Sequence, residues 1–188
     1  MRKMILFGVV MTGLLLNAGC LATSVVPLSY PEALSDTPWC RWDVTLVGFV
    51  DKRPAKTLGV MDEQTNYTAA SDVAEWVSRS LYREIESRGC RCVVVSVEST
   101  DEGFVIDGEV LSVSLDKIGI NQWSTHMDIR VQLSRDGEML FGQTYSGTVE
   151  RTFLLASEGP EAIMAEGLSD ILKDAAVKIT DAMRTAQR

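Results

Sequence analysis

Alternation of apolar and polar residues between positions 104 and 153 constrains the fold of this chain more than any other feature. A period of two is typical of β-strands that bury one face and leave the other in solvent. The pattern covers residues 104–115, continues in residues 123–133 and returns in residues 139–153. In the second of these strands the side chains expected to face inward are Met127, Ile129, Val131 and Leu133. The Asp136-Gly137 pair suits a tight hairpin, so the last strand is predicted to run antiparallel to the second.

A helix is predicted between Ser71 and Gly89, flanked by two further strands. Its apolar stripe recurs every four residues at Val73, Val77, Leu81 and Ile85. Ser71 or a neighbour is expected to cap the start, and Gly89 to end the helix in a left-handed conformation. Residues 42–50 and 90–97 are rich in apolar and β-branched side chains and are predicted strands. A strand–helix–strand passage normally joins parallel strands, so these two are expected to lie parallel in one sheet.

A second helix is predicted from Pro160, because proline suits the first helical turn. Its apolar stripe can cover one face of a sheet and consists of Met164, Leu168, Ile171, Leu172, Ala175, Ile179 and Met183. Residues 51–68 are predicted to be a polar loop. The order β-α-β-β-β-β-α predicts an α+β fold. We expect a two-layer sandwich whose mixed, mostly antiparallel sheet of about five strands carries both helices on one face.

The first 20 residues have the organisation of a secretory leader. Arg2 and Lys3 precede a 13-residue apolar run, which is too short to span a membrane, and small residues lead to Cys20. The segment resembles a bacterial lipobox, in which the cysteine thiol takes a diacylglyceryl group and becomes the first mature residue. Asn17 stands where a lipobox usually has leucine, so an ordinary secretory signal cut near Ala18 is the alternative.

The lipobox resemblance implies a division of the chain into three parts. Residues 1–19 are predicted to be a removed signal peptide, residues 20–38 a lipidated cysteine with a flexible, proline-containing tether, and residues 39–188 a single domain. The residue after Cys20 is Leu21 rather than aspartate, which resembles the sorting signal for retention in the bacterial outer membrane. We therefore expect a lipid-anchored protein on the periplasmic face of that membrane.

The charge balance restricts the partners of the mature chain. The whole sequence has 18 basic and 26 acidic residues, and removal of a leader that contains Arg2 and Lys3 leaves a net charge of −10. A negative surface of this size disfavours nucleic acid and anionic lipid headgroups. The membrane contact is therefore expected to be the lipid on Cys20, since two or three acyl chains anchor a protein stably.

Three cysteines remain after Cys20. An oxidising envelope favours pairing, and Cys90 and Cys92 lie too close along one strand to bridge each other easily. Parallel neighbouring strands begin at the same edge of a sheet, which brings Cys40 near the start of the second strand. A disulfide from Cys40 to either Cys90 or Cys92 is expected, and the choice between the two stays open. With one histidine and no CxxC spacing, no metal site is predicted.

The sequence offers little for catalysis. The single histidine, His126, falls on the polar face of a predicted strand, where a solvated side chain is expected rather than a general base. Asp107 and Glu109 share one strand face and could form an acid/base pair, but unbroken alternation also puts Val113 and Leu115 on that face. We take the carboxylates to be a polar edge of the strand. No nucleotide-binding or metal-binding motif occurs, and neither an enzyme nor a cofactor is predicted.

One stretch resembles a known family. The sequence VGFVDKRPAKTLGVMD, with Asp51, Arg53 and Pro54, and the helix end at residues 85–89 are similar to the YajG-like outer-membrane lipoproteins. The resemblance spans most of residues 42–185 and implies a non-catalytic α+β envelope lipoprotein. That group looks related in architecture to auxiliary lipoproteins of ABC-type lipid transporters and to the lipopolysaccharide-assembly plug protein. It supplies no catalytic residue for this chain.

Asp51 and Arg53 lie where the first predicted strand ends, a place where binding loops collect. Arg53 could bind a carboxylate or phosphate of a ligand, or it could fix the loop through an ion pair with Asp51.

Two functions remain after these exclusions. The first is a lipid-anchored adaptor or accessory subunit at the outer membrane that binds an envelope protein or peptidoglycan. The alternative is a carrier of lipid or another hydrophobic ligand in an envelope transport system, which would need an apolar groove between helix and sheet.

Overall fold

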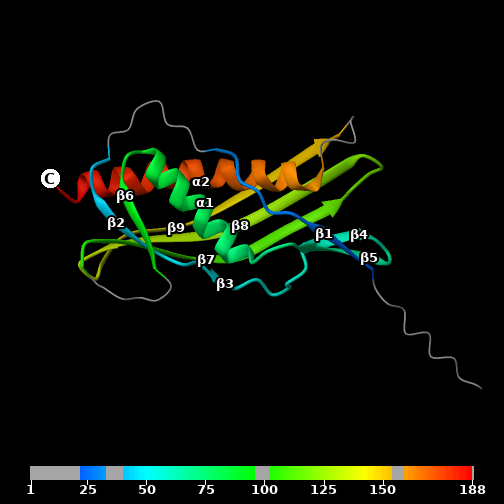
Figure 1. Ribbon diagram of the computed structural model, residues 1–188, viewed down its shortest axis with the longest axis horizontal. Coiled ribbons are helices and arrows are strands. Elements are labelled where there is room, and N and C mark those ends of the chain that lie inside the picture. Colours follow the sequence, from blue (N-terminus) through cyan, green and yellow to red (C-terminus); the bar gives the residue numbers. More distant parts are fainter. Residues whose placement is uncertain (1–21, 33–39, 96–101, 154–158, 188) are drawn as a thin grey trace, which may run out of the picture.

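The computed structural model in Figure 1 describes residues 22–32, 40–95, 102–153 and 159–187. The predicted signal peptide and the predicted lipidation site, Cys20, lie outside these residues. The described strands are β1 (Ala22–Val26), β2 (Asp43–Val47), β3 (Val50–Asp51), β4 (Gly59–Asp62), β5 (Thr65–Ala69), β6 (Arg91–Val95), β7 (Phe104–Lys117), β8 (Gln122–Arg135) and β9 (Glu138–Thr152). The described helices are α1 (Val73–Ser87) and α2 (Pro160–Thr185).

The main sheet and the helices form the predicted two-layer α+β sandwich. Strand order in this sheet is β6-β2-β7-β8-β9, and the short β3 pairs with β7 beside β2. β2 lies parallel to both β6 and β7. The parallel pairing of β2 with β6 is the one predicted from the strand–helix–strand passage. β8 is antiparallel to both of its neighbours, β7 and β9. Figure 1 shows α2 running along β8 and β9, with α1 packed beside it on the same face. The prediction of two helices on one face is confirmed.

The core lies between these two layers. The inward side chains predicted for β8 are all inaccessible to solvent, and so are most residues of the predicted α2 stripe. Burial of each such apolar side chain contributes roughly 1.5–3 kcal/mol to folding. The hairpin between β8 and β9 turns at Asp136 and Gly137, both with positive φ, as the Asp-Gly pair predicts.

Strand β7 departs from the predicted alternation. Its register with β8 shifts just after Val110, which marks a β-bulge. A bulge inserts one residue, so every side chain beyond it moves to the opposite face. Val113 and Leu115 are therefore buried in the core. Asp107 and Glu109 lie on the opposite face of the strand from Val113 and Leu115. The prediction that all four side chains share one face is wrong.

The segment predicted to be a polar loop contains two strands. β4 and β5 form a hairpin, and β1 adds to β5 in parallel, giving a separate sheet with the order β1-β5-β4. The hairpin is fastened to the main sheet where the Leu115 N–H donates to the Leu58 carbonyl over 2.6 Å. Buried Leu58 and Tyr67 supply the apolar contact that stabilises it. The sequence missed these strands because their few apolar residues stand among polar ones.

The prediction of a flexible tether is wrong for the part of residues 20–38 that the structure describes. Residues 22–26 form β1, and the chain beyond it lies along α1. The Trp76 indole donates to the Ser29 carbonyl over 2.8 Å, and the Tyr30 hydroxyl donates to Glu84 over 2.6 Å. Burial, then the Glu84 carboxylate, raises the pKa of Tyr30 well above its usual range. Glu84 is itself buried and needs a donor, which explains why this segment is held.

A disulfide joins Cys40 to Cys90 and closes a loop across the sheet edge. The Cys40 N–H donates to the Arg88 carbonyl over 2.9 Å, so Cys40 lies where α1 ends and the chain turns toward β6. Cys92 lies two residues further along, paired in register with Val44, and is a free thiol. Burial, and to a smaller extent Glu86, raises the pKa of that thiol to about 12, which makes it unreactive near neutral pH.

Removal of the disulfide tests its contribution to stability. We expect the double variant Cys40→Ser/Cys90→Ser to lose about 2–4 kcal/mol of unfolding free energy, because the crosslink restricts the unfolded chain. Denaturant unfolding measures the loss, and reductant should reproduce it in the wild type. Cys92→Ser is the matched control, and an equal loss in that variant would contradict the assignment.

Candidate functional site

The outer edge of β6 is the part of the described surface best suited to bind a partner. The Arg91 N–H donates to the Trp42 carbonyl and the Val95 carbonyl accepts from Gly48, so these groups point toward β2. Main-chain groups of alternate residues point to opposite sides of a strand, so those of Cys92 and Val94 face outward. No other described strand pairs with this edge.

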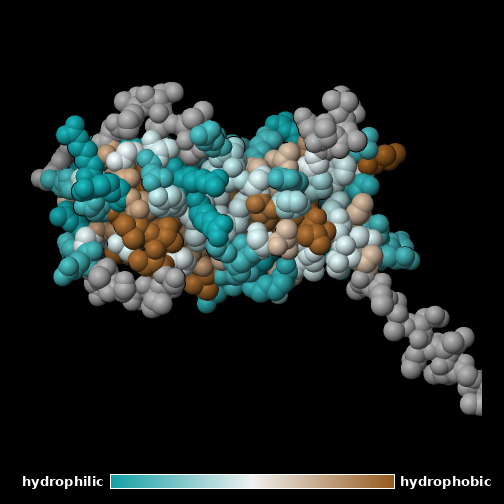
Figure 2. Space-filling model, in the orientation of Figure 1, coloured by the Kyte–Doolittle hydropathy of each residue, from teal (hydrophilic) through white to brown (hydrophobic). Residues whose placement is uncertain are grey.

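The same edge exposes apolar side chains. Val93 is 62% exposed and Val94 is 48% exposed, and Figure 2 shows brown side chains gathered over β6. Val50 of β3 is 50% exposed nearby. Exposed edges are normally protected by charge or proline. Of the five β6 residues only Arg91 is charged, which leaves the edge open to pairing.

A groove of about 590 Å³ adjoins this edge, between β3, β6 and the start of α1. Its lining combines main-chain and apolar groups with a few charged side chains: Gly48, Phe49, Val50, Asp51, Asp72, Ala74, Glu75, Ser78, Arg79, Val94 and Val95. The Phe49 N–H donates to the buried Ser78 hydroxyl over 2.9 Å, which fixes the chain at the bottom of the groove to α1. We call the β6 edge together with this groove the docking edge.

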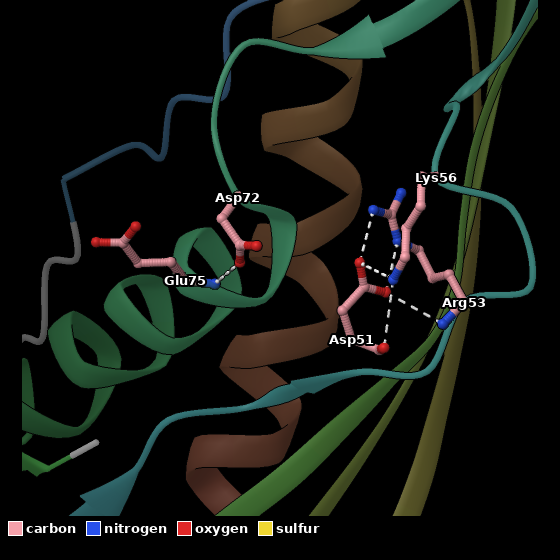
Figure 3. A network of polar contacts seen from close by, with 5 residues as sticks. All are labelled: Asp51, Arg53, Lys56, Asp72 and Glu75. Atoms are coloured by element: carbon pink, nitrogen blue, oxygen red, sulfur yellow. Dashed lines mark hydrogen bonds and ion pairs between the residues drawn. The ribbon is translucent and has the colours of Figure 1, made fainter. Parts of the chain in front are cut away.

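The charged groups around the groove are partnered within the protein. Asp72 caps α1 by accepting from the Glu75 N–H over 2.8 Å, as Figure 3 shows. The Glu75 carboxylate in turn pairs with Arg79 one turn along the helix. These contacts leave little unpaired charge for a ligand, so attraction to the docking edge rests on apolar surface and main-chain hydrogen bonds.

Asp51, which lines the groove, forms a compact network with Arg53 and Lys56 (Figure 3). The Asp51 carboxylate accepts from the Arg53 main-chain N–H at 3.1 Å and from Nε and Nη2 at 3.0 Å each. Lys56 adds an ion pair at 2.8 Å. The Arg53 side-chain hydrogen bond lowers the pKa of Asp51 far below its usual range, with help from Lys56.

The geometry of this pair matches the loop-fixing role considered for it. Arg53 is buried, and two of its three guanidinium nitrogens donate hydrogen bonds to the Asp51 carboxylate. The third, Nη1, is buried without a hydrogen-bond partner among the described residues. A guanidinium whose nitrogens are engaged in this way cannot form the bidentate hydrogen bonds by which arginine recognises the carboxylate or phosphate of a ligand.

The residues considered for catalysis lie on the face of the main sheet away from the helices. His126 contacts Thr148 at 2.9 Å through Nδ1 and Asp128 at 3.1 Å through Nε2. A hydroxyl, an imidazole and a carboxylate thus meet, but on an exposed strand surface whose neighbouring main-chain donors are engaged in the sheet ladder. Glu109 pairs with Arg130 across the strands at 2.8 Å. This arrangement is that of a cross-strand polar ladder.

Two further observations concern membranes and metals. No helix among the described residues is long and apolar enough to cross a membrane. Within the same residues, no three His, Cys, Asp or Glu side chains come together in a way that could hold a metal ion.

No family model matches the chain, and no curated protein matches its sequence. Among solved structures, XCC0632 of Xanthomonas campestris, from family DUF330, superimposes with a TM-score of 0.65 at 10% identity, covering 87% of this chain and 99% of that protein. The two chains share a fold. CT253 of Chlamydia trachomatis gives 0.46 at 11% identity, covering 76% of this chain and 98% of that one. Lipoprotein GNA1162 of Neisseria meningitidis gives 0.40 at 11% identity, with coverage of 72% and 98%.

The sequence anticipated only part of the docking edge. It indicated a strand in residues 90–97 and a loop at Asp51 and Arg53; of these residues, Asp51, Val94 and Val95 line the groove. It did not indicate that Val93 and Val94 are exposed, because an apolar β-branched run is equally typical of a central strand. Only the order of strands in the sheet reveals that β6 is an edge.

The variant Asp51→Asn tests the network by its pH dependence. The folded-state pKa of Asp51 lies below the unfolded value of about 3.9, so its stabilisation is present above that value and is lost as pH falls toward the folded-state pKa. Near neutral pH we expect a loss of about 3–5 kcal/mol in unfolding free energy, because the buried Arg53 loses its carboxylate. The difference from wild type should shrink below about pH 4.

Denaturant unfolding over this pH range measures both effects. Asp43→Asn is the matched control, since the Asp43–Arg91 ion pair is exposed on both sides and should contribute less than about 1 kcal/mol. Equal losses in the two variants, or a difference that does not change with pH, would rule out this role for Asp51.

Proposed function

We propose that this protein is a non-catalytic, lipid-anchored accessory subunit of the bacterial outer membrane that binds an extended segment of an envelope partner protein along the docking edge. The observation that carries the proposal is the apolar outer edge of β6, with which no other described strand pairs. A peptide that adds a strand there would hydrogen-bond the outward groups of Cys92 and Val94 and cover Val93. The adjoining groove would receive its side chains.

The anchor rests on the sequence. The leader, the lipobox-like residues before Cys20 and Leu21 after it indicate lipidation and retention at the outer membrane. We also assign the chain to the YajG-like lipoproteins on residues 51–54 and 85–89 and on the order of the elements. Confinement to the membrane by acyl chains raises the effective concentration of the domain near membrane-bound partners, so a modest docking edge can suffice.

Carriage of lipid between helices and sheet is the less favoured function. The space between the layers is filled by side chains that solvent does not reach, among them Leu81, Ile106 and Ile129. The groove beside β6 is open and bordered by the paired charges of Asp51 and Glu75, rather than enclosed and apolar. Binding of peptidoglycan is less favoured as well, because the apolar β6 edge lacks the polar side chains that sugars need.

Photo-crosslinking in cells tests the proposal. A photoreactive amino acid at Val93 of the lipidated protein should yield an adduct with one defined envelope protein. Mass spectrometry should map that adduct to an extended segment. The same residue at exposed Thr144 on the opposite, polar edge strand β9 should give none.

The variant Val94→Pro removes an N–H that faces away from β2 and leaves the internal ladder intact, so the fold should persist. With the crosslinker moved to Val50, this variant should lose the adduct, whereas His126→Ala should keep it. Adducts with lipid alone, with glycan alone or with a second copy of the chain would each contradict the proposal. So would an adduct that survives Val94→Pro.

A further inference from the structure

We propose that the loop between β7 and β8 inserts its isoleucines into the phospholipid surface beside the lipid anchor, so that the domain is held upright by two contacts. The inference rests on the proposed lipidation of Cys20. It adds a second membrane contact, made by Ile118 and Ile120, which the function proposed above does not require.

Chain length keeps the anchor close to the folded domain. β1 begins at Ala22, two residues after Cys20, so the two Cα atoms are at most about 7 Å apart. Ala22 is fixed in place, because its N–H donates to the Gln64 carbonyl over 2.9 Å and it pairs with Thr65. The acyl chains must therefore enter the bilayer next to the turn between β4 and β5.

The β7–β8 loop lies beside the same turn. The Asp62 carboxylate accepts from the Gln64 N–H over 2.9 Å, which lowers the pKa of Asp62, and the Lys117 ammonium contributes further to that shift. Lys117 is the last residue of β7 and immediately precedes Ile118. Gly59 at the start of β4 also lies directly against Leu115 of β7, where an added Cβ would come within 2.1 Å of the Leu115 carbonyl oxygen. The turn between β4 and β5 therefore lies between two elements. One is β1, which follows the anchor, and the other is the β7–β8 loop that contains Ile118 and Ile120, here called the isoleucine loop.

The loop presents its apolar side chains outward. Ile120 is 89% exposed, the highest value among the large apolar side chains that the structure describes, and Ile118 is 49% exposed. The N–H groups of Ile118 and Gly119 both donate to the Gln122 carbonyl, so the tip is a tight, ordered turn. Figure 1 shows this hairpin projecting at the end of the molecule that carries β1, and Figure 2 shows brown side chains at its tip.

A lipid surface is the occupant that fits these facts. Val25 of β1 and Val60 of β4 add exposed apolar surface to the small sheet. The acidic surface of the mature chain disfavours binding to anionic headgroups, so a second membrane contact has to be apolar. The acyl chains on Cys20 would bring the loop to the bilayer surface, and burial of the isoleucine side chains there adds membrane affinity.

Depth-dependent quenching tests the insertion. The full-length protein would be produced in bacteria, so that the leader is processed, and placed in phosphatidylcholine vesicles with brominated acyl chains. An environment-sensitive fluorescent amino acid replaces Ile120 in one sample and Met139 in another. Met139 is the matched control, because it is 62% exposed and follows the β8–β9 turn, at the other end of β7. We expect several-fold stronger quenching at position 120 than at position 139.

The variant Ile118→Asp should weaken quenching at position 120, because a carboxylate resists entry into the acyl region. Val177→Asp, at an exposed apolar site on α2, should leave it unchanged. Equal quenching at positions 120 and 139, or no effect of Ile118→Asp, would overturn the inference. Mass spectrometry of Cys20 separates the two proposals: absence of lipid contradicts both, whereas a lipidated protein without quenching contradicts only the insertion.

Discussion

The packing of α2 against the long strands β7, β8 and β9 is the interaction on which the rest of the structure depends. Close contact is possible where Gly147 of β9 lies under Ile171, since an added Cβ would come within 3.0 Å of that side chain. Gly167 likewise brings α2 close to Thr125 of β8. This layer buries the alternating residues of β8 and the helix stripe together. It also leaves the opposite face of the sheet polar, with His126 in a hydrogen-bonded ladder.

Long strands give the molecule two separate ends. β7 has 14 residues and spans about 45 Å at roughly 3.3 Å per residue. β2 pairs with the first residues of β7, and β6 lies beyond β2, so the docking edge is at the start of β7. The small sheet and the isoleucine loop lie at its end. In our proposals, the anchored end contacts the membrane, and the docking edge lies some tens of ångströms away from it. β1 connects the anchor to the domain through strand pairing, where a flexible tether was predicted.

Elements with strong local signals could be predicted from the sequence. The alternation in β8, the four-residue stripe of α1 and the stripe of α2 each report burial on one face. The contact between Asp51 and Arg53 is equally local. Features that depend on the fold as a whole could not be predicted: β1 becomes a strand only by pairing with β5, about 40 residues further along the chain. The bulge after Val110 and the exposure of Val93 likewise follow from neighbours that no local pattern identifies.

Hydrogen exchange at individual β6 amides would test most directly whether a partner strand covers this edge. The Val93 N–H points toward β2 and should exchange slowly in the purified protein and in isolated envelopes. The Val94 N–H points outward, so it should exchange fast in the purified protein and become protected in envelopes, where a partner strand accepts its hydrogen bond. Rapid exchange of the Val94 N–H in both samples would contradict the account.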